Sequence, residues 1–333
     1  MSTRYYVFRS SKTNSILRYF LKRQSGSSQR PLMYSGYLIG MANYRGQPTG
    51  RSMTNLRSGK HHTRRFLLAA VLLAGIGGHL VWSAHVSAEM STRQAQIAAA
   101  ALTAQRVKKL NDQITTLLPA NPDVTLSIST ISQVNGLQHY GSGAPFDGAS
   151  VGKLLTATDF LHHVELRTAS LQQIIDGQTA QSLLQQMIVN SDDAAWTSLN
   201  DFLTHADLGR FADSQGIHGY DPDTNTFGSN DIALLLQKLY DRQLLNAANR
   251  SLLLSYMAQA NYRTFIVAGV PAGYTVYHKV GEDDDDVHDA AIITNGKHYV
   301  ILVIFTDGYG TYDWDARAQL MQTITQDVSA AYL

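Results

Sequence analysis

The stretch Phe146-Asp-Gly-Ala-Ser-Val-Gly-Lys-Leu-Leu-Thr-Ala157 decides how this chain of 333 residues is interpreted. It begins with glycine and small polar residues and continues as an apolar run that suits a helix from Ser150 onward. Residues three apart share one helix face, so the Lys153 amine can reach the Ser150 hydroxyl. A helix start also places partial positive charge and free N–H groups beside the serine. The stretch therefore predicts a serine nucleophile with a lysine as its base.

Two further short motifs follow along the chain. Ser191-Asp-Asp193 comes directly after a helical segment that ends at Asn190, and Lys279-Val-Gly281 ends a predicted strand. Lys279 supplies a second cation, and a lysine that is desolvated beside another cation can act as a base. An S-x-x-K motif alone is common by chance, whereas three motifs in this order are far more specific.

In these residues the chain resembles the class A β-lactamase-like family of penicillin-recognising serine hydrolases, whose motifs are S-x-x-K, S-D-N and K-T-G. The resemblance extends over residues 126–333. It implies a β-lactamase/transpeptidase-like α+β fold, with an antiparallel sheet and a mainly helical subdomain. It also implies a β-lactam or a D-Ala-D-Ala peptidoglycan peptide as substrate, and no cofactor.

The resemblance implies a role for each motif residue. Ser150 would be the acylated nucleophile, Lys153 would activate it, and Ser191 would relay a proton to the leaving nitrogen. Lys279 would hold the substrate carboxylate. The backbone N–H groups of Ser150 and Glu282 would form the oxyanion hole. The positions expected to bind substrate are Asp193, Val280, Gly281 and Glu282.

Three departures from the family pattern bear on activity. Asp193 replaces an amide donor by a carboxylate, which cannot donate to a substrate amide when ionised. Val280 removes a hydroxyl contact to the substrate carboxylate. No glutamate lies between Ala194 and His278 to activate a deacylating water. The family's loop that carries this glutamate is shortened here to about residues 216–229. The carboxylates near this loop are Asp213, Asp221 and Asp223, which also suit turns and caps. We therefore expect slow deacylation of the acyl-enzyme.

The same departures leave a second hypothesis open. A family member without catalytic activity would bind cell-wall peptides or a partner protein. His278 stands beside the third motif, but alternation along a strand makes it face away from Lys279, so we assign it to packing. The acidic run 282–286 lacks the ligand spacing of a calcium loop and is interpreted as a solvated hairpin.

Hydrophobic periodicity predicts strands at both ends of the domain and helices between them. Strands are expected at 124–131, 137–140, 274–280, 290–294 and 298–305. Helices are expected at 171–175, 180–189, 194–204, 232–244, 251–259 and 314–332, besides the helix from Ser150. This order describes an α+β domain whose sheet is assembled from both ends of the segment.

The formal charge of +1 hides two blocks of opposite sign. Residues 1–65 contain 13 Lys and Arg and no acidic residue, whereas the rest of the chain has 14 basic and 26 acidic residues. Like-charge blocks are typically disordered or face different partners. We expect residues 1–65 to be a disordered basic segment, and we expect no nucleic-acid partner. With no cysteine, disulfides, thiolate zinc sites and cysteine nucleophiles are excluded. No H-E-x-x-H motif suggests a catalytic metal.

Between these blocks, residues 66–86 form a stretch of 21 residues without formal charge. Such a length crosses a hydrocarbon core of about 30 Å. The flanking arginines predict a cytoplasmic N-terminus and an extracytoplasmic domain, so we expect one transmembrane helix in the cell membrane. The alternative is a signal peptide that is cleaved near Ala88. Residues 87–118 predict a helical spacer, and the hydrolase domain is expected at 119–333.

Overall fold

The computed structural model describes residues 60–310 and 313–333, so the expected basic segment lies outside the described residues up to position 59. The first element is one long helix, α1 (Lys60–Ala120). Large apolar side chains of α1 between Phe66 and Trp82 are 55% to 75% exposed. Within the described part of the chain, α1 is the one helix that is long and apolar enough to cross a membrane.

The last turns of α1 belong to the hydrophobic core of the domain that follows. Leu110 and Ile114 are each only 1% exposed. The Tyr140 hydroxyl donates to the Asn111 side-chain oxygen over 2.7 Å. The segment 87–118, expected as a spacer, is therefore helical throughout, and its C-terminal turns pack against the domain.

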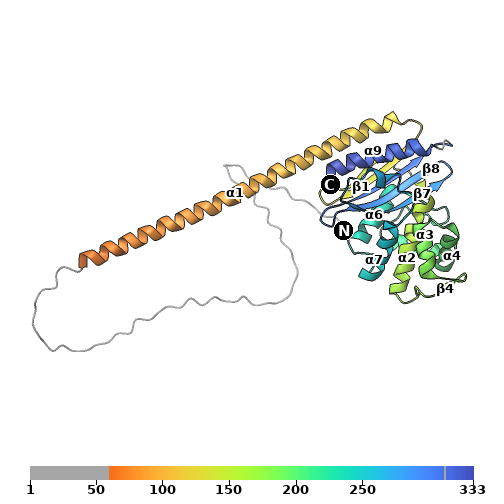
Figure 1. Ribbon diagram of the computed structural model, residues 1–333, viewed down its shortest axis with the longest axis horizontal. Helices are drawn as coiled ribbons and strands as arrows, with labels where there is room; N and C mark the ends of the chain where they lie inside the picture. Colours follow the sequence, from red (N-terminus) through yellow and green to blue (C-terminus); the bar gives the residue numbers. More distant parts are fainter. Residues whose placement is uncertain (1–59, 311–312) are drawn as a thin grey trace, which may run out of the picture. The chain divides into compact units, whose positions relative to one another are not determined.

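A five-stranded antiparallel sheet in the order β2-β1-β9-β8-β7 forms the centre of the domain (Figure 1). Its strands are β1 (Thr125–Ser132), β2 (Gly136–Gly141), β7 (Thr275–Asp283), β8 (Asp286–Thr294) and β9 (Tyr299–Asp307). Two strands come from the start of the domain and three from its end. The predicted α+β architecture is confirmed, including the hairpin formed by the acidic run.

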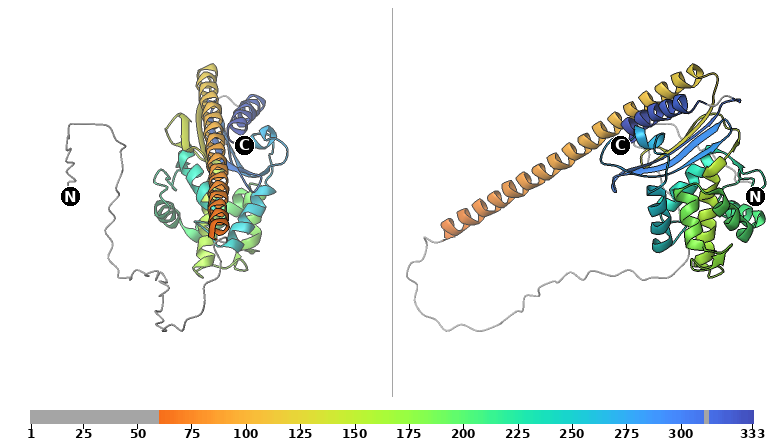
Figure 2. Two further views of the ribbon diagram at one scale, coloured as in Figure 1. Left: turned by 90° about the vertical axis from the view of Figure 1, so that its left-hand side faces the viewer. Right: turned by 45° about the vertical axis from the view of Figure 1, so that its right-hand side comes forward.

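The sheet is covered on both faces, which explains why its central strand is apolar from Val300 to Phe305. Successive residues of β9 alternate between two hydrophobic clusters. One face is covered by α9 (Trp314–Tyr332), by the short α8 (Ile266–Gly269) and by the end of α1. The other face is covered by the helical subdomain, and Figure 2 shows the sheet between these layers.

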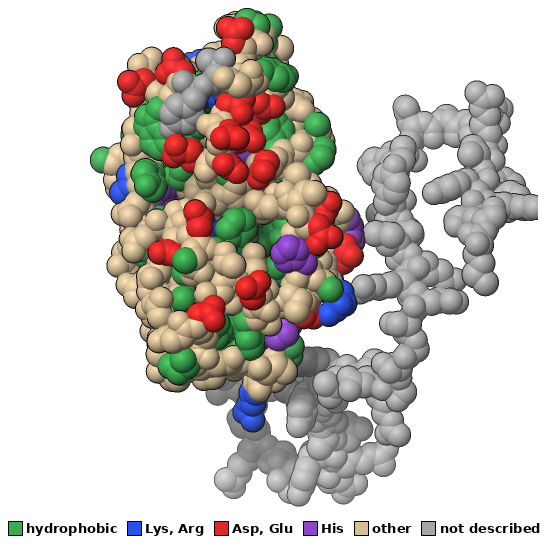
Figure 3. Space-filling model, turned by 90° about the vertical axis from the view of Figure 1, so that its right-hand side faces the viewer, with side chains coloured by type: hydrophobic (Ala, Val, Ile, Leu, Met, Phe, Trp, Pro, Cys, Tyr) green, Lys and Arg blue, Asp and Glu red, His purple; other side chains and the backbone are tan. Residues whose placement is uncertain are grey.

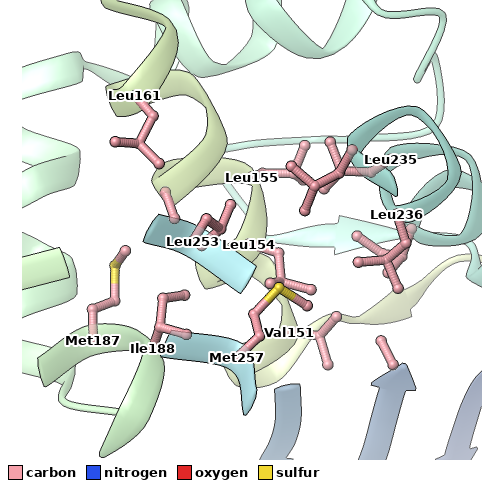
Figure 4. Packing of buried hydrophobic residues seen from close by; sticks show 14 of the residues in the cluster. Val151, Leu154, Leu155, Leu161, Met187, Ile188, Leu235, Leu236, Leu253 and Met257 are labelled. Atoms are coloured by element: carbon pink, nitrogen blue, oxygen red, sulfur yellow. The ribbon is translucent and has the colours of Figure 1, made fainter. Parts of the chain in front are cut away.

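The helical subdomain surrounds the helix that follows the first motif. A 3-10 turn, η1 (Ala149–Gly152), leads directly into α2 (Lys153–Glu165). Around α2 lie α3 (Ala180–Val189), α4 (Asp193–Leu203), α5 (His205–Ser214), α6 (Ser229–Tyr240) and α7 (Ala247–Ala258). Figure 4 shows side chains of α2 in one cluster with Met187, Ile188, Leu235, Leu236, Leu253 and Met257 from three other helices. This packing fixes the start of α2 in the core.

The helix predicted at 171–175 is wrong. Leu171 and Gln172 form a turn, and Ile174–Ile175 forms β4, which pairs with β5 (Gln178–Thr179). Asp176 and Gly177 between these strands both have positive φ, 45° and 82°. That backbone is typical of a two-residue hairpin turn, so the Asp-Gly pair determines the local structure rather than the flanking apolar residues. A second short pair joins β3 (Phe146–Asp147) to β6 (Thr226–Phe227).

Candidate active site

Ser150 lies in η1, whose backbone is held by side chains from two directions. Asp147 Oδ1 accepts a hydrogen bond from the Ala149 N–H over 2.9 Å. Asn225 Nδ2 donates to the Ala149 carbonyl over 2.9 Å. Ala149 has a φ of +42°, a conformation that costs a residue with a side chain about 1–3 kcal/mol. The two hydrogen bonds offset this cost and fix the backbone beside Ser150.

Lys153 is the centre of the site. Its residue exposure is 0%, and its Nζ lies 2.5 Å from Ser150 Oγ and 2.5 Å from Asp193 Oδ1. The same nitrogen donates to the Ser191 carbonyl over 3.0 Å and lies 3.4 Å from Ser191 Oγ. The Trp196 ring packs beside it, with 4.9 Å between Nζ and the ring centroid. The contact expected between Lys153 and Ser150 is present.

Two opposing effects act on the pKa of Lys153. Burial lowers this pKa, because removing an ammonium from water disfavours the charged form. The hydrogen bond and the charge of Asp193 raise it, and burial is the larger effect. The amine is therefore neutral more often than an ordinary lysine, which lets it accept the Ser150 proton.

Lys279, on β7, brings a second amine to the same place. It is 2% exposed, and its Nζ donates to Ser191 Oγ over 2.8 Å and to the Val280 carbonyl over 2.6 Å. Burial, reinforced by the nearby charge of Lys153, lowers the pKa of Lys279 to about 7. The Ser191 hydroxyl thus lies between two buried lysines and can pass a proton between them and a substrate.

Ser191 is positioned by the junction between α3 and α4. Its φ of +60° ends α3 in a left-handed residue. The next residue, Asp192, caps α4 by accepting a hydrogen bond from the Ala195 N–H over 2.8 Å. This tight connection turns both the Ser191 hydroxyl and the Asp193 carboxylate toward Lys153.

Strand β7 is an edge strand of the sheet, and it lies against η1. A Cβ atom on Gly281 would come within 3.0 Å of both the Gly148 carbonyl oxygen and the Val151 nitrogen. Glycine at this position therefore allows the strand to approach the turn that carries Ser150. Val280 is 5% exposed and packs in the cluster beneath α8 and α9. Glu282, whose N–H is expected in the oxyanion hole, follows at the exposed end of the strand.

His278 faces away from Lys279, as alternation predicts. Its Nδ1 lies 3.1 Å from Asp289 Oδ1, and both side chains are fully buried. The other Asp289 oxygen accepts a hydrogen bond from the Ile266 N–H at the start of α8. The pair therefore supports the layer behind β7 rather than the cleft.

Asn225 and His288 support the nucleophile turn but were not singled out by sequence reasoning. Asn225 has a φ of +52°, and its Oδ1 would be 2.1 Å from a Cβ on Gly152. His288 Nε2 donates to the Asp147 carbonyl over 2.7 Å, and burial lowers the pKa of His288 to about 4, so the ring is neutral. The Asp-Pro-Asp-Thr-Asn sequence of this loop is typical of a turn, and asparagine tolerates left-handed backbone, so the conformation of Asn225 could have been predicted.

The carboxylates at the end of α5 and in the loop after it, which could serve as a deacylation base, are exposed and bonded elsewhere. Asp213 lies 3.2 Å from the His218 ring, and Asp223 lies 2.9 Å from the His205 ring. Asp221 Oδ1 accepts a hydrogen bond from the Asp223 N–H. These are the turn contacts that such residues ordinarily make. In the described ranges, no group of three or more His, Asp or Glu side chains is arranged to hold a metal ion.

Comparisons with known proteins agree with this arrangement. A sequence model described as the beta-lactamase enzyme family matches residues 109–332. The structure of PBP-A is similar over 67% of this chain and 95% of that chain, with 22% identity and a TM-score of 0.63. An ancestral class A beta-lactamase is similar over the same share of this chain and 100% of its own chain, with 22% identity and a TM-score of 0.62. A comparison with curated proteins gave no match. The expected β-lactamase/transpeptidase-like fold is confirmed.

Replacing Lys279 by Met should stabilise the full chain in a pH-dependent way. The unfolded chain holds this proton to a pH of about 10.4, whereas the folded chain releases it near pH 7. The unfolded state therefore binds more protons between these pH values. Burial of the Lys279 amine destabilises the fold by its full amount below pH 7, and this destabilisation disappears as the pH approaches about 10.4. We expect a melting temperature at least about 2 °C above wild type below pH 7, with the gap closing as the pH rises.

Thermal unfolding of both proteins across this range measures the effect. The control is Lys297→Met, which removes an exposed lysine in the turn between β8 and β9 and should give a small difference that does not change with pH. A gap for Lys279→Met that widens as the pH rises would contradict the account.

Proposed function

Because the chain belongs to the beta-lactamase enzyme family, we propose that it is a serine hydrolase that β-lactams and D-Ala-D-Ala peptidoglycan peptides acylate at Ser150. One observation carries the proposal: the buried Lys153 amine lies 2.5 Å from Ser150 Oγ. A serine is a weak nucleophile until a base takes its proton, and this contact supplies the base. A point variant of the similar protein PBP-A is known as an acyl-enzyme complex with penicillin G.

The proposed reaction begins with proton transfer from Ser150 to neutral Lys153. The freed oxygen attacks the substrate carbonyl, and the resulting oxyanion accepts hydrogen bonds from the N–H groups of Ser150 and Glu282. Ser191, bonded to Lys279, carries the proton to the leaving nitrogen, and the bond between carbonyl carbon and nitrogen breaks. The positive charge of Lys279 attracts the substrate carboxylate. The product is an ester between Ser150 and the acyl group.

Substitution of the nucleophile gives the direct test. A fluorescent penicillin should label the full chain covalently, and Ser150→Ala should lose the label, because no other hydroxyl has the Lys153 contact at 2.5 Å among the described residues. The matched control is Ser251→Ala, at an exposed serine of α7, which should label like wild type. Labelling is read by gel fluorescence, and the modified peptide by mass spectrometry.

A wild-type chain that takes up no label would reject the acyl-enzyme proposal. It would favour the second candidate, a binding module for cell-wall peptides. The observation that supports this candidate is the exposed Asp193 carboxylate, which forms an ion pair with Lys153. In that case Ser150→Ala should leave peptide binding unchanged.

We further propose that the acyl-enzyme hydrolyses slowly. The support is the loop between α5 and α6, where Asn225 rather than a carboxylate contacts the nucleophile turn. Without a positioned base, water attacks the ester slowly, because general-base catalysis typically supplies about a hundredfold or more. Intact-mass spectrometry after removal of free penicillin should show the acyl adduct persisting over many minutes.

Variants of the three aspartates near this loop test whether one of them is the deacylation base. Asp213→Asn, Asp221→Asn and Asp223→Asn should each change the deacylation rate constant by less than about threefold, since none is expected to act as the base. A loss of tenfold or more in one variant would identify that residue as the base and refute this part of the proposal.

We also propose that residues 66–86 anchor the chain in the cell membrane with the domain outside. The exposed apolar side chains of this part of α1 support the anchor. Leu72→Arg combined with Leu73→Arg should release the chain from membranes during alkaline carbonate extraction, because each arginine near the bilayer centre costs about 2.5–3.5 kcal/mol.

Two arginines at Ala99 and Ala100, exposed on the same helix beyond the span, form the control. This variant should stay in the membrane pellet together with wild type. A wild-type chain that appears as a soluble product starting near Glu89 would instead establish a cleaved signal.

A further inference from the structure

The carboxylate of Asp193 indicates which acyl donors the site accepts. We propose that the site selects acyl donors that carry a protonated amino group on the side chain next to the carbonyl that Ser150 attacks. This inference rests on the proposed function, since it concerns the acyl group that is transferred to Ser150.

The position of Asp193 places its carboxylate beside the reacting bond. Asp193 Oδ1 and Ser150 Oγ each lie 2.5 Å from the same Lys153 nitrogen. The carboxylate is therefore within two hydrogen-bond lengths of the nucleophile. Its side chain is 84% exposed, whereas Lys153 is fully buried. An acyl group that reaches Ser150 must pass next to this exposed carboxylate.

The chemistry of a carboxylate determines which group it can bind there. An ionised carboxylate only accepts hydrogen bonds, so a neutral acyl group can offer it at most an amide N–H. A protonated amine offers several donors and a positive charge, and such charge-assisted hydrogen bonds are roughly twice as strong as neutral ones. Lys153 occupies one oxygen of Asp193 from the buried side, and a substrate ammonium would approach from the cleft.

The surroundings of Asp193 strengthen this preference. Asp147 precedes the nucleophile turn, Asp283 ends β7, and both are exposed. The pKa of Asp283 is raised, first by partial burial and then by the charges of Asp147, Asp284 and Asp193, so these carboxylates share one electrostatic field. Acidic side chains also predominate over basic ones on the face shown in Figure 3.

The cations of the site are buried and already paired with groups of the protein. Lys153 and Lys279 are 0% and 2% exposed, and both amines are hydrogen-bonded to groups of the protein. Asp192, which also acts on Lys153, adds a further negative charge at the start of α4. A cationic acyl donor therefore meets the exposed Asp193 carboxylate, rather than a free cation, next to Ser150.

Two penicillins that differ by one amino group test the proposal. Ampicillin has an amino group on the carbon next to its side-chain carbonyl, and benzylpenicillin has hydrogen there. Acylation rate constants of the full chain are measured with both compounds by intact mass at about pH 6, where an α-amino group with a pKa of about 7.7 is protonated. Ampicillin should react about two- to fivefold faster, the range expected of one exposed ion pair.

Asp193→Asn should bring the ratio of the two rate constants close to one, because it removes the ion pair. The substitution also removes a partner of Lys153 and changes both rate constants, but this effect is common to the two compounds and cancels in the ratio. Asp201→Asn, which removes an exposed carboxylate further along α4, is the matched control and should leave the ratio unchanged.

Several results would overturn the proposal. One is a wild-type ratio near unity, and another is a ratio that Asp193→Asn does not alter. If Asp193→Asn is inactive, the wild-type ratio must fall as the pH rises through the pKa of the amine, and a flat ratio would reject the proposal. Equal acylation by both compounds would overturn this inference alone. No acylation by either compound would overturn the proposed function and this inference with it.

Discussion

The burial of the Lys153 amine beside Ser150 is the interaction on which the rest of the site depends. An ammonium taken out of water loses hydration, and this loss lowers its pKa. The Lys153 nitrogen lies 2.5 Å from the Ser150 hydroxyl and 2.5 Å from the Asp193 carboxylate, so it contacts the proposed nucleophile and a counter-ion at once. Because the two partners favour different protonation states of the amine, the identity of the residue at position 193 sets how readily the serine is activated.

The fold brings the partners of Lys153 together from distant parts of the chain. Ser191 is 38 residues away and Lys279 is a further 88 residues from Ser191. The core around α2 fixes Lys153, the α3–α4 junction fixes Ser191, and the edge strand β7 carries Lys279. Gly281 permits the strand to lie directly against the nucleophile turn. Helices cover both faces of the sheet, and the three segments meet at its β7 edge.

Local patterns in the sequence were sufficient for much of the fold and for the central pair. The pattern of apolar residues predicted the strands, because the inner strands are buried along most of their length. The spacing of three residues predicted the contact between Ser150 and Lys153. The contacts of Asn225 and His288 with the nucleophile turn span 76 and 141 residues, so no local pattern encodes them. The helix predicted at 171–175 failed because positive φ at Asp176 and Gly177 favours a hairpin turn. The ion pair of Asp193 with Lys153 likewise required the packing of α4 against α2.

The protonation of Lys153 in the folded chain is the quantity that tests this account most directly. Lysines labelled with carbon-13 at Cε report their protonation by NMR, and Lys153→Ala assigns the signal. The account predicts that Lys153 titrates clearly below the ordinary value of about 10.4, and that Asp193→Asn moves the titration lower still, since the carboxylate raises the pKa of the amine. A Lys153 signal that titrates at or above the ordinary value, unchanged by Asp193→Asn, would contradict the account.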